Sequence, residues 1–182
     1  MKSALVAAVS VAAATVLPVL TASAQDQSTR PAAKATFKNL QGEDVGTATL
    51  AATPSGYVLI QVEVNGLEQG ERGFHVHETG ECDPATEFKS AGGHLAGGKE
   101  HGVLVEGGPH PGDMPNQHVG ENGVLRADVF NERIKLTDSG DGALFDADGS
   151  ALMVHSQPDD YTSQPSGEAG GRVACAVIEK VE

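Results

Sequence analysis

Histidines are concentrated in one stretch of this 182-residue chain. Five of its seven histidines lie between His75 and Asp113. Imidazole is a middling core residue and is costly to bury without a partner, so such a concentration is rarely accidental in a globular domain. Imidazole is also the commonest metal ligand in proteins. A metal centre is therefore the first hypothesis for this chain.

The first two of these histidines, His75 and His77, form an H-x-H pair in a strand-like run over residues 73–77. Side chains alternate along a strand, so both imidazoles would face one side and could chelate one ion. Taken alone, the pair is a weak signal, because a chance pair on a strand surface has the same pattern.

A second group of four residues follows in what reads as a loop. The residues are His94, His101, His110 and Asp113. Three imidazoles and a carboxylate make a good tetrahedral zinc set, and four protein ligands leave no open position, which suits a structural role. His155 stands apart near the C-terminus. His118 has no further ligand at a useful spacing, and we interpret it as a solvated loop residue.

The elements that would position these residues are short strands. Runs rich in Val, Thr, Ile and aromatic residues alternate with turn sequences and predict an all-β sandwich or Greek-key barrel. The runs cover residues 35–40, 45–52, 57–64, 73–77, 124–129, 151–155 and 172–179. Two long connections, residues 78–122 and 156–171, show no strand or helix pattern. Since the first of them carries four histidines and a cysteine, we expect a functional loop whose backbone is ordered by metal ligands.

The N-terminal 24 residues have the pattern of a secretory signal peptide. Lys2 precedes an apolar run over residues 4–20, and Ala22-Ser23-Ala24 is an A-x-A cleavage pattern. A membrane anchor is the alternative, but the run is short, contains Pro18 and is not followed by stop-transfer charges. We therefore predict a signal peptide over 1–24, a flexible leader over 25–33, one domain over 34–182, and a location in the periplasm.

The charge of the chain limits its partners. The formal net charge is −13, and removal of a signal that contains one lysine and no acid would leave −13 − 1 = −14. No cluster of Lys and Arg is present that could displace counterions from phosphate groups. This composition argues against binding to nucleic acid or, after signal cleavage, to an anionic membrane.

The chain has two cysteines, Cys82 and Cys175. In an oxidising compartment we expect them to form a disulfide, which would close a long loop. Two thiolate metal ligands are the weaker alternative, because neither cysteine belongs to a C-x-x-C pair.

Several motifs occur in order along nearly the whole mature chain. They are G-F-H-V-H-E (73–78), G-E-C (80–82), S-A-G-G-H (90–94), K-E-H-G (99–102), P-H-P-G-D-M-P-N (109–116), M-V-H-S-Q-P-D-D (153–160) and G-G-R-V-A-C-A-V-I (170–178). Together they resemble the copper/zinc superoxide dismutases of the bacterial exported kind. The resemblance implies an eight-stranded Greek-key β-barrel with two long functional loops.

The resemblance also implies the metal ligands, with His94 bridging the two metals. Copper would bind His75, His77, His94 and His155, and zinc would bind His94, His101, His110 and Asp113. Asp159 would link a copper histidine to a zinc histidine, Cys82 would pair with Cys175, and Arg172 would line the copper entrance and attract the anion.

The implied activity is the dismutation of superoxide to oxygen and hydrogen peroxide by a redox-cycling copper, as an antioxidant defence outside the cytoplasm. His94 and Arg172 would be the catalytic residues. A periplasmic copper/zinc-binding protein without turnover is one alternative, and a zinc hydrolase is another. A homodimer stays open, because an exposed apolar strand face and a core face look alike in a sequence.

The chain departs from the family pattern in two places. The gap between His94 and His101 is one residue shorter than in many members, and the loop over residues 156–171 contains no Lys or Arg. Because the overall charge would repel superoxide, attraction must come from copper, Arg172 and a lysine such as Lys89 or Lys99.

Overall fold

The computed structural model describes Met1 and residues 31–181. Apart from Met1, the predicted signal peptide and the leader up to residue 30 lie outside the described residues, and the first strand begins at Ala33. In the described part, no helix has the length and apolar character needed to cross a membrane.

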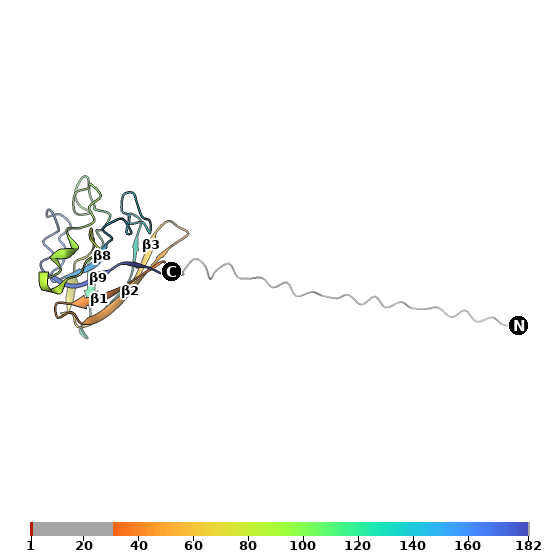
Figure 1. The fold of residues 1–182 in the computed structure, drawn as a ribbon, viewed down its shortest axis with the longest axis horizontal. Helices are drawn as coiled ribbons and strands as arrows, with labels where there is room; N and C mark the ends of the chain where they lie inside the picture. Colours follow the sequence, from red (N-terminus) through yellow and green to blue (C-terminus); the bar gives the residue numbers. More distant parts are fainter. Residues whose placement is uncertain (2–30, 182) are drawn as a thin grey trace.

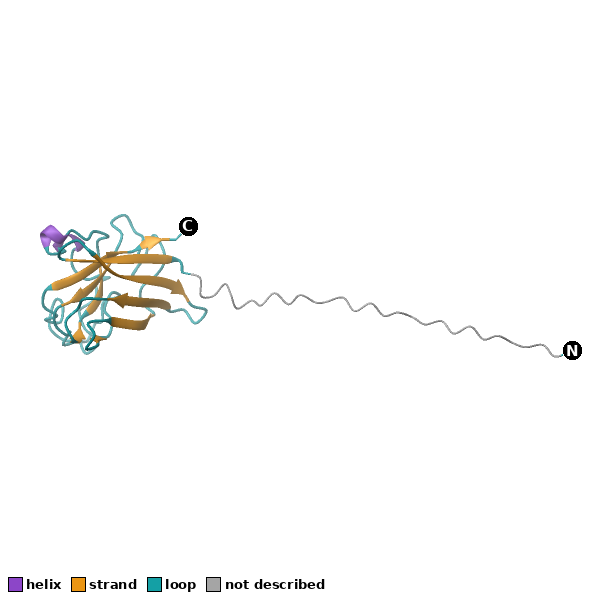
Figure 2. Cartoon of the chain, turned by 90° about the horizontal axis from the view of Figure 1, so that it is seen from below, coloured by secondary structure: helices purple, strands orange, loops and turns teal. Residues whose placement is uncertain are grey.

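The described residues form β-strands and two short 3-10 turns (Figure 2). In chain order they are β1 (Ala33–Asn39), β2 (Asp44–Ala52), β3 (Val58–Val64), β4 (Gly70–Arg72), β5 (Phe74–His77), η1 (Pro84–Thr86), η2 (Lys89–Ala91), β6 (Gln117–Val119), β7 (Leu125–Asn131), β8 (Ala151–His155), β9 (Arg172–Val177) and β10 (Glu179–Lys180). The prediction of an all-β fold is confirmed.

The strands pair antiparallel in the order β4-β6-β7-β3-β2-β1-β9-β8-β5, and β10 pairs with β1. The two edges of this path, β4 and β5, are consecutive in the chain and are separated by Gly73 alone, so the sheet curls into a nearly closed barrel. The path has nine strands, compared with the seven runs found in the sequence and the eight strands that the family resemblance implies. The two strands that match no run, β4 and β6, have three residues each, too few to show an alternating pattern.

Alternation of buried and more exposed residues builds part of the barrel core. In β3, Val58, Ile60, Val62 and Val64 are buried, and the residues between them are more exposed. In β5 and β8 every residue is buried, because both faces are covered. Phe74 and Val76 of β5 point into the main core, which leaves His75 and His77 on the side covered by loops.

The two long connections gather at one side of the barrel. In Figure 1 the green segment around residues 78–116 and the blue segment around residues 156–171 lie at the left of the barrel. Hydrogen bonds join the two loops directly, for example from the backbone N–H of His101 to the side chain of Gln164. The site therefore forms where these loops cover β5 and β8.

Candidate metal centre

Three of the predicted copper ligands form one compact group. Ligand atoms of His75, His94 and His155 all lie within 4.8 Å of one another, and all three residues are buried. His75 lies on β5 and His155 at the end of β8, which is the strand paired with β5. His77 joins the group at its edge, where its Nε2 lies 3.4 Å from Nε2 of His155.

The four predicted zinc ligands form a second group, in which ligand atoms again lie within 4.8 Å of one another. Asp113 is at its centre. Its Oδ1 lies 3.1 Å from Nδ1 of His94, 3.0 Å from Nδ1 of His101 and 3.3 Å from Nδ1 of His110. His94 belongs to both groups, so the two sets of ligands adjoin through one imidazole.

Backbone hydrogen bonds explain why the loop places its ligands beside β5. Val76 in the middle of β5 donates from its N–H to the carbonyl of Gly112 and accepts at its own carbonyl from the N–H of Leu95. Isolated bridges also pair His75 with Asp113 and His77 with His94. The loop thus continues the sheet at its β5 edge, and its ligands come into register with those of the strand.

Several buried ring nitrogens of these histidines have no hydrogen-bond partner among residues 31–181, which indicates whether the residues fit metal ions. Among residues 31–181, Nδ1 of His75, Nε2 of His94 and Nδ1 of His110 are buried and lack a hydrogen-bond partner. An unpartnered buried polar atom costs free energy, and a bound metal would satisfy all three nitrogens. Imidazole suits both copper and zinc, and the added carboxylate suits zinc. The ligand sets fit the two metals.

Burial keeps His77, His94 and His155 neutral. It lowers the pKa of His94 to about 4, and it lowers the pKa values of His77 and His155 well below their usual range. For Asp113, burial alone would raise the pKa, but the adjacent ring of His110 and hydrogen bonds from His94 and from the backbone N–H of Gly102 hold it far below its usual value. Neutral imidazoles beside an ionised carboxylate are ready to bind cations.

Asp159 connects the two groups. Its Oδ2 accepts a hydrogen bond from Nε2 of His75 at 2.7 Å, and its Oδ1 accepts one from Nε2 of His101 at 3.0 Å. Burial would raise the pKa of Asp159, but these hydrogen bonds and that from the backbone N–H of Tyr161 lower it. The bond to Nε2 of His75 fixes the orientation of that ring and leaves Nδ1 facing the copper group.

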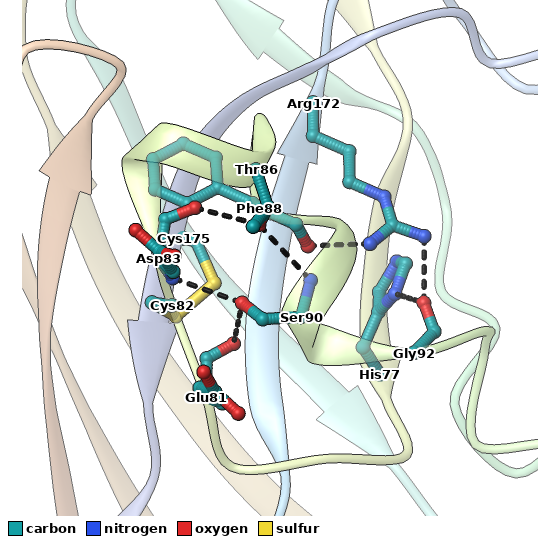
Figure 3. Close-up of a disulfide and its surroundings, with 10 residues drawn as sticks. All are labelled: His77, Glu81, Cys82, Asp83, Thr86, Phe88, Ser90, Gly92, Arg172 and Cys175. Atoms are coloured by element: carbon teal, nitrogen blue, oxygen red, sulfur yellow. Dashed lines mark hydrogen bonds between the residues drawn. A yellow bond between two sulfur atoms is a disulfide. The ribbon is translucent and has the colours of Figure 1, made fainter.

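Arg172 at the start of β9 lies beside His77 (Figure 3). Its guanidinium donates to the carbonyl of Phe88 at 2.5 Å and to the carbonyl of Gly92 at 2.6 Å. Nδ1 of His77 also bonds the carbonyl of Gly92, at 3.1 Å. One carbonyl thus orients both a predicted copper ligand and the arginine.

The predicted disulfide between Cys82 and Cys175 is present, with an S–S distance of 2.00 Å, and the alternative of two thiolate ligands is therefore wrong. Cys175 lies on β9, three residues after Arg172. The bond ties the segment that carries Phe88 and Gly92 to the strand that carries the arginine (Figure 3).

His118 lies apart from both ligand groups. It lies on strand β6 and not in a loop as the sequence predicted, but its side chain is 65% exposed, as expected of a solvated residue, and its Nδ1 lies 3.0 Å from Oε1 of Glu71 on β4.

Sequence reasoning missed two amide side chains that join the loops. Asn116 and Asp159 form a reciprocal pair: Nδ2 of Asn116 donates to the carbonyl of Asp159, and the N–H of Asp159 donates to Oδ1 of Asn116, each at 2.8 Å. Gln164 forms the same kind of pair with the backbone of His101. Asn116 ends the motif over residues 109–116 but had no role assigned to it, and Gln164 lies outside the motifs found in the sequence.

Comparison with known proteins agrees with this geometry. A family model described as copper/zinc superoxide dismutase matches residues 45–178. The Aquifex aeolicus protein named superoxide dismutase [Cu-Zn] 2 is 48% identical over 148 residues, which cover 80% of this chain and 85% of that protein. The Caulobacter vibrioides superoxide dismutase [Cu-Zn] is 41% identical over 150 residues, covering 81% and 85%. The solved structure of a SOD-like protein from Bacillus subtilis superposes with a TM-score of 0.74 at 34% identity, covering 79% of this chain and 95% of that one.

The fold is a nearly closed β-barrel, and its loops bring together two ligand groups that share one histidine. This arrangement defines a protein with a binuclear metal centre. The chain belongs to the copper/zinc superoxide dismutase family.

Proposed function

We propose that this protein is an exported superoxide dismutase, which converts two superoxide anions and two protons to oxygen and hydrogen peroxide. The observation that carries the proposal is the position of His94. Its Nδ1 lies beside Asp113 in one ligand group, and its Nε2 is buried without a partner in the other. Such a histidine can bridge two metals. The names of the family and of its bacterial relatives support the same activity.

Each metal would be held by four side chains. The copper ligands are His75, His77, His94 and His155, and the zinc ligands are His94, His101, His110 and Asp113. Bound copper supplies a one-electron redox couple, and bound zinc supplies a fixed positive charge beside His94. Asp159 holds one ligand ring of each set, which keeps His75 and His101 in their orientations.

Two residues would act on the substrate. Arg172 keeps its charge at any physiological pH, and two carbonyls fix its guanidinium beside His77, so it can attract and orient a small anion there. His94 is placed to deliver a proton from Nε2 while Nδ1 stays held at Asp113.

Export to the periplasm is part of the proposal. The signal-peptide pattern over residues 1–24 supports it, and so does the disulfide between Cys82 and Cys175, because disulfides persist in oxidising compartments and are rare in the cytosol. The alternative of a copper/zinc-binding protein without turnover has no need of an arginine fixed beside the copper ligands.

The proposal can be tested with His155→Ala and a matched control, His118→Ala. His155 is buried in the copper group, whereas His118 is exposed and belongs to neither group. Each purified protein is analysed for copper and zinc and assayed for superoxide decay. We expect wild type and His118→Ala to bind both metals and to catalyse decay, and His155→Ala to lose copper and catalysis but to keep zinc. A wild type that binds both metals without accelerating decay would support the carrier alternative instead.

A further inference from the structure

The loop over residues 156–171 contains no Lys or Arg, so it supplies no positive charge to attract an anion. It does contact the zinc ligands. Oδ1 of Asp159 bonds the ring of His101, and the side chain of Gln164 bonds the backbone of His101. The loop therefore contributes to the site by holding the zinc ligand His101.

Gln164 forms two hydrogen bonds with the backbone of one residue. The N–H of His101 donates to Oε1 of Gln164 at 2.9 Å, and Nε2 of Gln164 donates to the carbonyl of His101 at 2.8 Å. A side-chain amide has a donor and an acceptor side by side, so it can satisfy both backbone groups as a neighbouring strand would. The two residues are 63 positions apart in the chain, so this pair is a tertiary contact.

The ring of His101 is fixed at the same time. His101 has no exposed surface, its Nδ1 lies 3.0 Å from Asp113, and its Nε2 lies 3.0 Å from Asp159. The two hydrogen bonds between Gln164 and the backbone of His101 and the two contacts of the His101 ring together fix the position of its Nδ1, beside the other zinc ligands. A ligand held in this way loses little conformational freedom when a metal binds.

The segment that carries Gln164 is itself rigidly built. Oδ1 of Asp160 accepts from the N–H groups of Thr162 and Ser163, and Gly167 closes the turn by donating to the carbonyl of Ser163 at 2.7 Å. Gly167 has a φ of +68°, and a Cβ there would lie 1.9 Å from Oδ1 of Asp159. The turn thus packs directly against the carboxylate that bonds His101.

We propose that Gln164 is a positioning residue of the zinc site, which holds His101 in its ligand position before the metal arrives. The inference rests on the zinc set proposed above. The loop over residues 156–171, which has no Lys or Arg, would then contribute to zinc affinity through Gln164. Replacement of residues that orient metal ligands typically costs 10- to 100-fold in metal affinity. Because Gln164 is itself exposed to solvent, water can replace part of its contribution, and we expect a loss of about tenfold.

Gln164→Ala tests the proposal, and Gln157→Ala is the matched control. Gln157 lies in the same loop and is exposed, and its side chain makes no hydrogen bond within residues 31–181. The zinc dissociation constant of each full-length mature protein is measured by competition with a chelator. Cobalt(II) is then bound in place of zinc, and its visible spectrum reports the ligand geometry. We expect zinc binding about tenfold weaker and an altered cobalt spectrum in Gln164→Ala, and neither change in Gln157→Ala.

Gln164→Glu separates the hydrogen bonds from the volume of the side chain. The carboxylate keeps the acceptor for the N–H of His101 but places an oxygen against the His101 carbonyl, so we expect weaker zinc binding here as well. Wild-type zinc affinity and cobalt spectrum in both Gln164 variants would overturn the proposal. A wild-type protein that binds no zinc would instead refute the zinc set itself, and the positioning role would fall with it.

Discussion

Reduction of the disulfide between Cys82 and Cys175 should destabilise the metal-free protein by several kcal/mol. The two cysteines are separated by 93 residues, and a closed loop of that length contributes about 4.6 kcal/mol at 25 °C in the chain-entropy estimate. Cys175 is fully buried beside Phe88 and Met153, so a reduced thiol at the same place keeps nearly the same packing. The loss should therefore come mainly from the unfolded chain.

The assay is urea unfolding of the metal-free protein with and without a phosphine reductant, with the free energy of unfolding in water obtained by linear extrapolation. Removing the metals matters, because zinc and copper would stabilise both forms and hide the difference. The variant with Cys82→Ala and Cys175→Ala serves as the control, since the reductant should not change its stability. A reduced wild type within about 1 kcal/mol of the oxidised one would refute this reasoning.

Three further predictions follow from the site. As the pH falls from 6.5 towards 4, the free energy of unfolding of the metal-free protein should fall by about 3 kcal/mol from His94 alone. The unfolded chain binds a proton at His94 in this range, whereas the buried ring, whose pKa burial lowers to about 4, does not. Urea midpoints at both ends of the range measure this loss of stability, and equal midpoints would contradict the prediction. Arg172→Ala should lower the rate constant for superoxide decay about tenfold without loss of metal, whereas Arg126→Ala, which breaks an exposed ion pair between β7 and Glu63 of β3, should leave the rate unchanged. An unchanged rate in Arg172→Ala would remove the arginine from the mechanism. Asp159→Asn should weaken metal binding about 10- to 100-fold in a chelator competition, and Asp141→Asn, at an exposed turn, should leave metal binding unchanged. Equal metal affinities of Asp159→Asn and the wild type would show that the carboxylate does not orient the ligands.

Much of the fold could be predicted from the sequence because it depends on local alternation. The run predicted over residues 57–64 contains β3, in which residues 58–64 alternate buried and more exposed positions. The short strands β4 and β6 could not be predicted, because each holds its place through pairing with the other strand and not through a pattern of its own. The closure of the barrel at Gly73 depends on the whole sheet and has no local signal.

The site divides in the same way. The residues named as ligands have chemistry that shows in the sequence, and the structure brings most of them within ligand distance of one another. The residues that hold these ligands in place have no recognisable pattern in the sequence. Gln164 reaches His101 across 63 positions, and the carbonyls of Phe88 and Gly92 that hold Arg172 are backbone groups, which every residue possesses. These contacts follow from the path of two loops over β5 and β8.

The most direct test of the central claim is the rate of superoxide decay as copper is added stepwise to the zinc-loaded mature protein, followed by pulse radiolysis. We predict no catalysis without copper, a rate that rises in proportion to bound copper, and a plateau at one copper per chain, because residues 31–181 form one such ligand group, around His75, His94 and His155. The same rate before and after the addition of copper would contradict the account.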